Sequence, residues 1–207
     1  MKLKDIAQFQ IGDTVSHVEK LGTVSSTGNC RLYEKNMFTY ELGKFTNNAK
    51  SRYVTFNNPS GNIKFVQLDD GIISIMTNEM VVSSGKDENN YPLVLTANFA
   101  KVTILDSTIV DMNYLAYWFN YDDEALRQLA IASEVSSTII KRLNINQLKN
   151  LEITLPPLEI QKNIGLIYIN QLTYNRIMEE EIFLKNAVAL EKIKKINTIS
   201  KRKISNE

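Results

Sequence analysis

The sequence predicts an α+β protein, in which a globular domain of mixed strands and short helices precedes one long C-terminal helix of the coiled-coil type. Two observations lead to this fold class. In the first part of the chain, short runs rich in β-branched and aromatic residues alternate with turn-forming Asn, Gly, Pro and Asp. After Pro156-Pro157 the chain contains one glycine, Gly165, and no proline, and apolar residues recur at helical spacing. We therefore expect a domain, a long helix and a basic tail, over residues 1–155, 156–200 and 201–207.

The globular domain carries its strand signals in its first half. Runs of apolar residues bounded by turn residues predict four strands. The dipeptides Gly61-Asn62 and Asp70-Gly71 are turn candidates, because glycine and asparagine tolerate the backbone angles that tight turns require. The four predicted strands cover residues 52–56, 63–67, 71–76 and 93–96.

Helix signals follow these strands. Asp111 is a suitable N-cap for a helix over 112–120, since its carboxylate can accept a hydrogen bond from the first turn. A second helix is predicted over 122–132, with Leu126 and Leu129 facing the core. The apolar face of the first helix is formed by Leu115, Trp118 and Phe119.

The start of the long helix is marked by Pro156-Pro157, which follows a short predicted helix over 144–149 and an alternating strand over 151–155. Proline fits the first turn of a helix but not its interior, so we expect the helix to begin immediately after this pair. Glu159 then lies in the first turn, where the helix dipole favours an anion. Continuous as far as the basic segment near its end, the helix would be about 60 Å long at ~1.5 Å per residue.

The apolar residues of this long helix fall into two groups, separated by three consecutive glutamates, Glu179 to Glu181. A helix of this length cannot bury an apolar stripe on one small domain, so we expect these residues to pack on a partner helix. They are Ile160, Ile164 and Ile167, followed by Phe183, Ala187, Leu190 and Ile193.

The composition sets limits on the environment of the protein. The chain has 207 residues and a single cysteine, Cys30, so no intrachain disulfide can form, which suits a reducing compartment. The first nine residues carry charges where a signal peptide would be apolar. No apolar stretch is long enough to cross a membrane. We therefore expect a cytoplasmic protein that does not associate with membranes.

The charge distribution says more than the formal net charge of +1. Between Leu42 and Leu68 there is no acidic residue, and this stretch holds four lysines and arginines and five asparagines. A second block, from Lys192 to Lys203, has six basic residues and no acidic one. Such stretches are suited to phosphate contacts, although a solvated loop explains most polar runs and a frayed, solvated helix end explains the second block well.

The sequence lacks the common catalytic and metal-binding patterns. With one histidine, His17, and one cysteine there is no zinc-finger spacing and no Cys–His nucleophile pair. No phosphate-binding glycine loop is present, and no acidic residue stands two positions before a lysine, as it does in many nucleases. The acidic clusters fall in predicted turns or helix starts, where solvated capping explains them. We therefore expect no catalytic residues, no metal and no cofactor.

The segment Leu148-Lys-Asn-Leu-Glu-Ile-Thr-Leu-Pro-Pro-Leu-Glu-Ile-Gln-Lys162 resembles the specificity subunits of Type I restriction–modification systems. In that family a target-recognition domain passes into a long conserved helix at such a junction. The likeness covers nearly the whole chain, and the Leu-Pro-Pro-Leu-Glu-x-Gln part is its most specific piece. Further pieces that resemble the family are Lys2–Ala7 with Gly12, Asp70–Ile75 with Val81-Val82, and Leu95–Ala100 with Asn113–Leu115.

The chain departs from this family in one respect. The usual member contains two recognition domains and two long helices, whereas this chain has one of each. The resemblance then implies a half-length subunit whose domain reads one half of a split site in double-stranded DNA. Its helix would set the spacing and dock a methyltransferase subunit and, through it, a restriction subunit. Antiparallel pairing with a second copy would give a homodimer that reads a palindromic site.

The resemblance also directs attention to three polar segments that can contact DNA. The first lies within the acid-free stretch, the second precedes the junction, and the third follows the strand predicted over 71–76. Their alternative interpretations are a solvated loop and a helix cap with basic residues near a helix end. The candidate DNA-contacting residues are Lys44, Asn47, Asn48, Lys50, Ser51, Arg52, Tyr53, Thr77, Asn78, Ser137, Thr138, Lys141 and Arg142.

Two other functions are alternatives to DNA recognition. An adaptor or decoy would retain the helix, bind restriction–modification subunits and read no DNA. A small enzyme such as a nuclease would need motifs that the sequence lacks.

Overall fold

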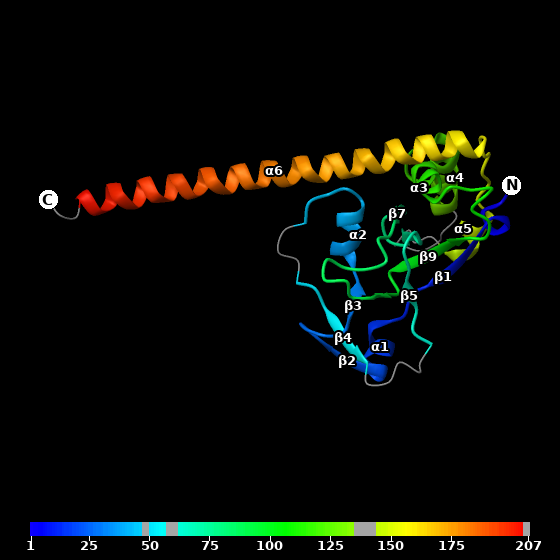
Figure 1. The fold of residues 1–207 in the computed structure, drawn as a ribbon, viewed down its shortest axis with the longest axis horizontal. Coiled ribbons are helices and arrows are strands. Elements are labelled where there is room, and N and C mark those ends of the chain that lie inside the picture. Colours follow the sequence, from blue (N-terminus) through cyan, green and yellow to red (C-terminus); the bar gives the residue numbers. More distant parts are fainter. Residues whose placement is uncertain (47–49, 57–61, 135–143, 205–207) are drawn as a thin grey trace.

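The computed structural model describes residues 1–46, 50–56, 62–134 and 144–204. It confirms the α+β fold class: two β-sheets and several short helices form one domain, and a single long helix, α6 (Leu158–Ile204), extends away from it (Figure 1). The N-terminus lies beside the start of α6, and the far end of the helix stands clear of the domain (Figure 1).

A four-stranded antiparallel sheet supports the start of α6. Its order is β1-β9-β6-β7, and β9 pairs with both β1 and β6. The largest hydrophobic core lies between this sheet and the helices, and Trp118, Phe119 and Leu148 are fully buried in it. The strands are β1 (Ala7–Ile11), β9 (Phe99–Ile104), β6 (Gly71–Ser74) and β7 (Glu79–Val82).

A five-stranded sheet forms the rest of the domain, in the order β2-β4-β3-β8-β5. Its pairs are antiparallel except β3 with β8, which run parallel with Arg31 opposite Leu93. Its strands are β2 (Gly22–Ser25), β3 (Cys30–Tyr33), β4 (Tyr53–Phe56), β5 (Phe65–Val66) and β8 (Leu93–Leu95), and the short helices nearby are η1 (Leu3–Asp5), α1 (Val15–Leu21) and α2 (Lys35–Glu41).

The predicted strands are present but shorter than expected. The segments 52–56, 63–67, 71–76 and 93–96 contain β4, β5, β6 and β8, and β5 is reduced to two residues. A turn precedes β6, where Asp69 takes a positive φ of 63°. Of the other turn candidate, Gly61 lies outside the described residues.

The strand predicted over 151–155 is wrong, although its alternation is real. Leu151 and Ile153 are buried, but the segment forms only an isolated bridge between Glu152 and Lys2. Its partner is the N-terminal end of the chain, where the backbone N–H of Ile153 donates to the carbonyl of Met1 at 2.8 Å. The chain continues from Lys2 directly into η1 at Leu3, so the strand pairing with Glu152 cannot extend further.

The central helices follow their sequence signals with one exception. Asp111 caps α3 (Met112–Tyr121) by accepting from the N–H of Tyr114 at 2.9 Å, and the predicted face of α3 is buried. Asn144 caps α5 (Ile145–Asn150). In α4 (Asp123–Glu134), Leu129 is buried, but Leu126 is 44% exposed, because the helix packs through Ala125 and Leu129, four residues apart.

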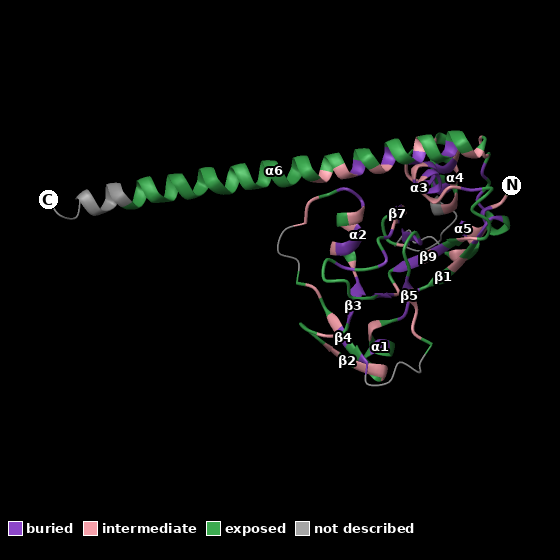
Figure 2. Cartoon of the chain, viewed as in Figure 1, coloured by how far each residue is buried: buried purple, intermediate pink, exposed green. Residues whose placement is uncertain are grey.

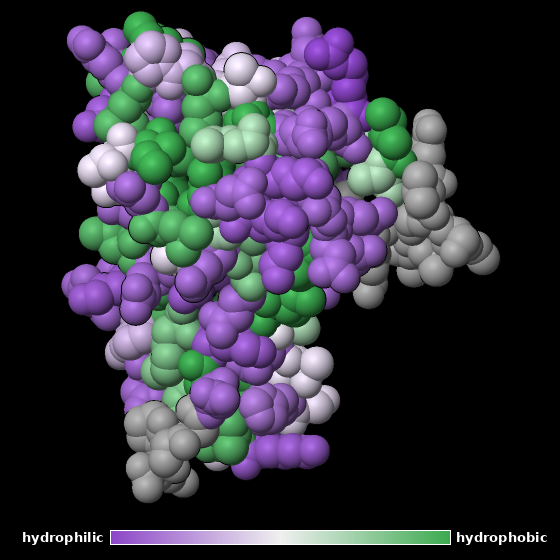
Figure 3. Space-filling model, turned by 90° about the vertical axis from the view of Figure 1, so that its right-hand side faces the viewer, coloured by the Kyte–Doolittle hydropathy of each residue, from purple (hydrophilic) through white to green (hydrophobic). Residues whose placement is uncertain are grey.

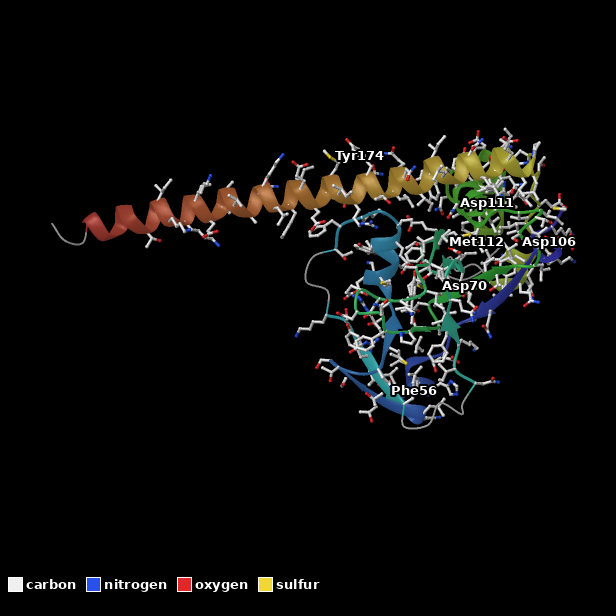
Figure 4. The ribbon with its side chains drawn as sticks, in the orientation of Figure 1. Phe56, Asp70, Asp106, Asp111, Met112 and Tyr174 are labelled. Carbon is white, nitrogen blue, oxygen red and sulfur yellow. The ribbon has the colours of Figure 1, made fainter. Side chains whose placement is uncertain are left out.

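Helix α6 packs on α3 through only its first turns. The buried face consists of Gln161, Gly165, Tyr168 and Leu172, whose spacing places them in one stripe along the helix. A Cβ at Gly165 would lie 2.7 Å from Oδ1 of Asp111, which lies beneath α6 (Figure 4), so glycine is what allows the two helices to approach. From 173 to 198 no described side chain of α6 is fully buried (Figure 2).

The face of α6 that packs on the domain differs from the predicted apolar stripe. Ile164 packs against the domain's own core, so its assignment to a partner helix is corrected. Ile160 and Ile167 are 47% and 70% exposed. The 47 residues of α6 span about 70 Å at ~1.5 Å per residue, more than expected because the helix continues through the basic segment to Ile204.

Candidate DNA interface

A polar cleft of about 750 Å³ opens where the start of α2, the approach to β4 and the turn after β8 meet. We call it the basic cleft. Its lining includes three basic side chains and one acidic side chain, Glu34. Its polar lining includes Lys35, Asn36, Thr46, Lys50, Arg52 and Asn98.

The charges of the basic cleft are unequal. Arg52 donates through Nε to Oε1 of Glu34 at 3.0 Å, and this hydrogen bond raises the pKa of the guanidinium, so Arg52 is a cation whose charge Glu34 partly offsets. Glu34 is free to do so because its side chain makes no capping hydrogen bond at the start of α2. Lys35 and Lys50 are exposed, and within the described part of the chain neither forms an ion pair. These two lysines therefore carry most of the available positive charge.

A second cleft of about 540 Å³ adjoins the first and shares Asn36 and Thr46 with it. Ser51 lines this cleft together with Arg31, which is buried and lies 3.8 Å from Asp87. The local acidic groups make this cleft less positive than the basic cleft.

Tyr53 lies on β4 and lines neither of these clefts. Its hydroxyl donates to Oδ2 of Asp87 at 3.4 Å, and its ring packs edge-to-face on Tyr91 with centroids 5.8 Å apart. These contacts give Tyr53 a packing role within the domain.

Three other predicted residues, Lys44, Thr77 and Asn78, meet in a separate cleft of about 570 Å³ between the domain and α6. We call it the helix-side cleft. Lys44 Nζ lies 3.8 Å from Oε1 of Glu79. Asn78 takes a positive φ of 57° in the turn between β6 and β7, and its Oδ1 is buried with no hydrogen-bond partner among the described residues. Leu172 completes the cleft from α6.

The structure thus divides the predicted DNA-contacting segment between different clefts. Lys50, Ser51 and Arg52 fall in or beside the basic cleft, whereas Lys44 faces α6. The remaining predicted residues, Asn47, Asn48, Ser137, Thr138, Lys141 and Arg142, lie outside the described residues.

Lys35, Asn36 and Asn98 are among the polar residues of the basic cleft that sequence reasoning missed. Lys35 and Asn36 begin α2 and Asn98 follows β8, so no local pattern links them to Lys50. Only the fold brings these segments together.

The described residues offer neither a metal-binding cluster nor a membrane-spanning helix. Among the described residues there is no group of three or more His, Cys, Asp or Glu that could hold a metal ion. Within the same part of the chain, no helix is long and apolar enough to cross a membrane.

At the end of the molecule near the N-terminus, hydrophilic and hydrophobic side chains are interspersed over the surface (Figure 3).

Comparison with known proteins identifies the family. Residues 1–182 match the Type I restriction modification DNA specificity domain. No match was found among curated proteins.

Two solved structures are similar to this chain. One is the crystal structure of the HsdS subunit from Thermoanaerobacter tengcongensis, with a TM-score of 0.52 and 19% identity over 88% of this chain and 39% of that chain. The other comes from a structural study of complex assembly and conformational transition of the type I R-M system, with a TM-score of 0.52 and 20% identity over 94% of this chain and 41% of that chain. At these identities the likeness shows a shared fold, and the chain spans less than half the length of either relative.

The match confirms the resemblance inferred from the junction around Pro156-Pro157. It also agrees with the prediction that the chain is not an enzyme, because the matched family is described as a DNA specificity domain. The matched region covers most of the sequence, and the chain therefore belongs to the family of Type I restriction modification DNA specificity domains.

Proposed function

We propose that this chain reads one half of a bipartite DNA site and directs methyltransferase and restriction subunits to it. The observation that carries this proposal is the basic cleft, because the chain belongs to a family of DNA specificity domains. Lys35 and Lys50, which form no ion pair with any described residue, supply positive charge for phosphates. Asn98 supplies the paired amide donor and acceptor that suit an adenine edge, and Asn36, whose Oδ1 accepts from the N–H of Met37 at 2.9 Å, supplies its amide N–H groups. Contacts to phosphate would position the domain, and the amides would contribute base preference.

A homodimer formed by antiparallel helices would supply the second half-site. Beyond Phe183, α6 exposes large apolar side chains along its length, which a lone helix in water would not keep exposed without cost. The helix also carries Glu179–Glu181 and, some thirteen residues later, Lys192, Lys194 and Lys195. In an antiparallel pair, the acidic segment of each copy can lie against the basic segment of the other. Exposed apolar residues of this half are Leu184, Val188, Leu190, Ile193 and Ile196.

The DNA proposal is tested by selection from random duplexes, using the purified chain together with its methyltransferase subunit. We expect enrichment of one split, palindromic sequence and binding that weakens steeply as salt rises. Selected pools with no sequence preference, despite a formed complex, would overturn the proposal.

The dimer is tested by sedimentation of the wild-type chain and of Leu190→Glu. Leu190 is 57% exposed, so the domain should keep its stability while the dimer dissociates. Asn197→Glu adds the same charge to the same helix, at an exposed polar position, and serves as the control. Unchanged mass for Leu190→Glu would argue against pairing through this half of α6.

The second candidate function is an adaptor that binds partner subunits through α6 and reads no DNA. The observation that favours it is that α6 exposes its side chains beyond Phe183 (Figure 2) and contributes no residue to the basic cleft, so this part of the helix can bind a partner without the cleft. Replacing Lys35 and Lys50 by alanine distinguishes the two: unchanged action of the partner enzymes on DNA would favour the adaptor.

A further inference from the structure

The segment that follows α2 packs against α6 from Leu172, where the contact between α6 and α3 ends, as far as Phe183. Gly43 takes a positive φ of 79°, and a Cβ there would lie 2.6 Å from the carbonyl oxygen of Leu172. The backbone of this segment therefore approaches the helix as closely as a glycine permits.

Three side chains of α6 extend this contact. The guanidinium of Arg176 lies over the ring of Tyr40, 4.2 Å from its centroid, and Nη1 donates to the Tyr40 carbonyl at 3.4 Å. Oε2 of Glu179 accepts from the backbone N–H of Phe45 at 2.8 Å. The ring of Phe183 packs on that of Phe45, with centroids 5.1 Å apart.

These contacts lie on one face of the helix. Leu172, Arg176, Glu179 and Phe183 are spaced at i, i+4, i+7 and i+11, which keeps them in line along α6. The same line continues the buried face that begins at Gln161. The helix is thus held at two places, first on α3 and then on the segment after α2.

The second contact determines whether α6 can pivot. The helix packs on α3 only as far as Leu172, and its described side chains beyond Phe183 are all exposed. From Leu172 to Thr198 the helix spans about 39 Å at ~1.5 Å per residue. A pivot of about 10° would move its end by about 7 Å, which is roughly two base-pair steps of ~3.4 Å.

We propose that Arg176, Glu179 and Phe183 form a strut that fixes the angle between α6 and the recognition domain, and so fixes the spacing of the half-sites that a dimer accepts. This inference rests on the proposed function, because half-site spacing exists only if two domains read DNA together. The strut holds Phe45, whose neighbour Thr46 lines the basic cleft, so it also connects the helix to the DNA-reading surface.

The test uses a double variant, Glu179→Ala with Phe183→Ala, and a double control, Glu159→Ala with Leu166→Ala. Both doubles remove one glutamate and one large apolar side chain from α6, but only the first removes contacts to Phe45, and the control positions are exposed and lie outside the half of α6 proposed to pair. Each protein, with its methyltransferase subunit, is offered duplexes that carry the selected half-sites with spacers varied by single base pairs. We expect wild type and control to favour one spacer, and the strut variant to lose at least about threefold of that preference with the half-site sequence unchanged.

A measurement without DNA keeps the two proposals separate. Spin labels at Thr55→Cys and Asn197→Cys, in a Cys30→Ala background and diluted with unlabelled chain, report the distance between the domain and the end of α6. The strut variant should give a broader distance distribution than the control. Equal widths would overturn the strut, whereas a broadened distribution in a protein without sequence preference would support the strut and overturn the proposed function.

Discussion

At the scale of single residues, Glu124 connects three parts of the chain that meet beneath the start of α6. Its Oε2 accepts from Nε1 of Trp118 and from the backbone N–H of Thr154, both at 3.0 Å, and its Oε1 accepts from the Thr154 hydroxyl at 2.9 Å. Burial acts to raise the pKa of Glu124, but the hydrogen bonds from Thr154 and Trp118 outweigh it and hold the pKa below its usual range. A carboxyl with a lowered pKa stabilises the fold above its unfolded pKa and loses that contribution as the pH falls through its folded pKa.

Glu124→Gln should therefore destabilise the protein in a pH-dependent way. At pH 7 we expect a loss of about 1–2 kcal/mol, because charge-assisted hydrogen bonds become neutral ones. The difference from wild type should shrink as the pH falls through the lowered folded pKa of Glu124, where the wild-type carboxyl takes up a proton. Urea denaturation at pH 7 and over an acidic series measures this, with the neighbouring exposed Asp123→Asn as control. A difference that stays constant with pH would contradict the assigned cause.

Gln161, the glutamine of the junction sequence, has a structural task. It is 1% exposed, and its side chain donates to the carbonyls of Ile109 and Pro156 at 3.0 and 2.8 Å and accepts from the N–H of Asp111 at 3.0 Å. Gln161→Leu keeps the size of the side chain but removes the partner of three partly buried backbone groups, so we expect a loss of about 2 kcal/mol. Chemical denaturation against Gln171→Leu, an exposed position on the same helix, measures it. Equal losses in the two variants would show that the buried network contributes little.

At the scale of elements, two effects oppose each other at Gly165 of α6. Alanine is favoured over glycine within a helix by about 1 kcal/mol. Against this, a Cβ at Gly165 would lie 2.7 Å from Oδ1 of Asp111 and 2.8 Å from the backbone nitrogen of Tyr114, and backbone cannot move aside cheaply. The packing of α6 on α3 should therefore decide whether an alanine at this position stabilises or destabilises the protein.

We expect Gly165→Ala to lower the free energy of unfolding by about 1–3 kcal/mol, despite its better helix propensity. Asn163→Ala, at an exposed position two residues earlier, should be neutral or slightly stabilising. Thermal unfolding followed by circular dichroism compares the two variants. If Gly165→Ala proved the more stable protein, the close approach of α6 to α3 would be refuted.

At the scale of the whole molecule, a chain with a net charge of +1 can bind DNA only if its charges are arranged on one surface. In this fold the acidic residues near the basic cleft are few, and Lys35 and Lys50 face it without ion pairs among the described residues. Each phosphate contact formed on binding adds about 0.9 to the magnitude of the negative slope of log affinity against log salt concentration.

Lys35→Ala with Lys50→Ala should accordingly reduce the magnitude of this slope by about 2 for each domain bound and weaken binding to all sequences alike. Fluorescence anisotropy over a range of salt concentrations, with the methyltransferase subunit present, measures it. Lys4→Ala with Lys185→Ala removes the same charge away from the cleft and is the control. An unaltered slope in the cleft variant would show that the DNA interface lies elsewhere on the domain.

The candidate site was predicted from the sequence only in part. Of the residues that the acid-free stretch singled out, Lys50 and Arg52 line the basic cleft, but Lys44 faces α6, and Tyr53 packs within the domain. Lys35 and Asn98 gave no signal, because they reach the cleft from segments far from Lys50 in the chain.

The sequence by itself determined the α+β class, the cap at Asp111 and the start of the long helix after Pro156-Pro157, because capping and proline geometry depend on a few neighbouring residues. Only the tertiary structure decided which face of α6 packs on the domain, that Leu126 is exposed, and which polar side chains share a cleft. Periodicity gives the spacing of a stripe but not its direction, and contacts such as that of Phe45 with Phe183 join residues far apart in the chain.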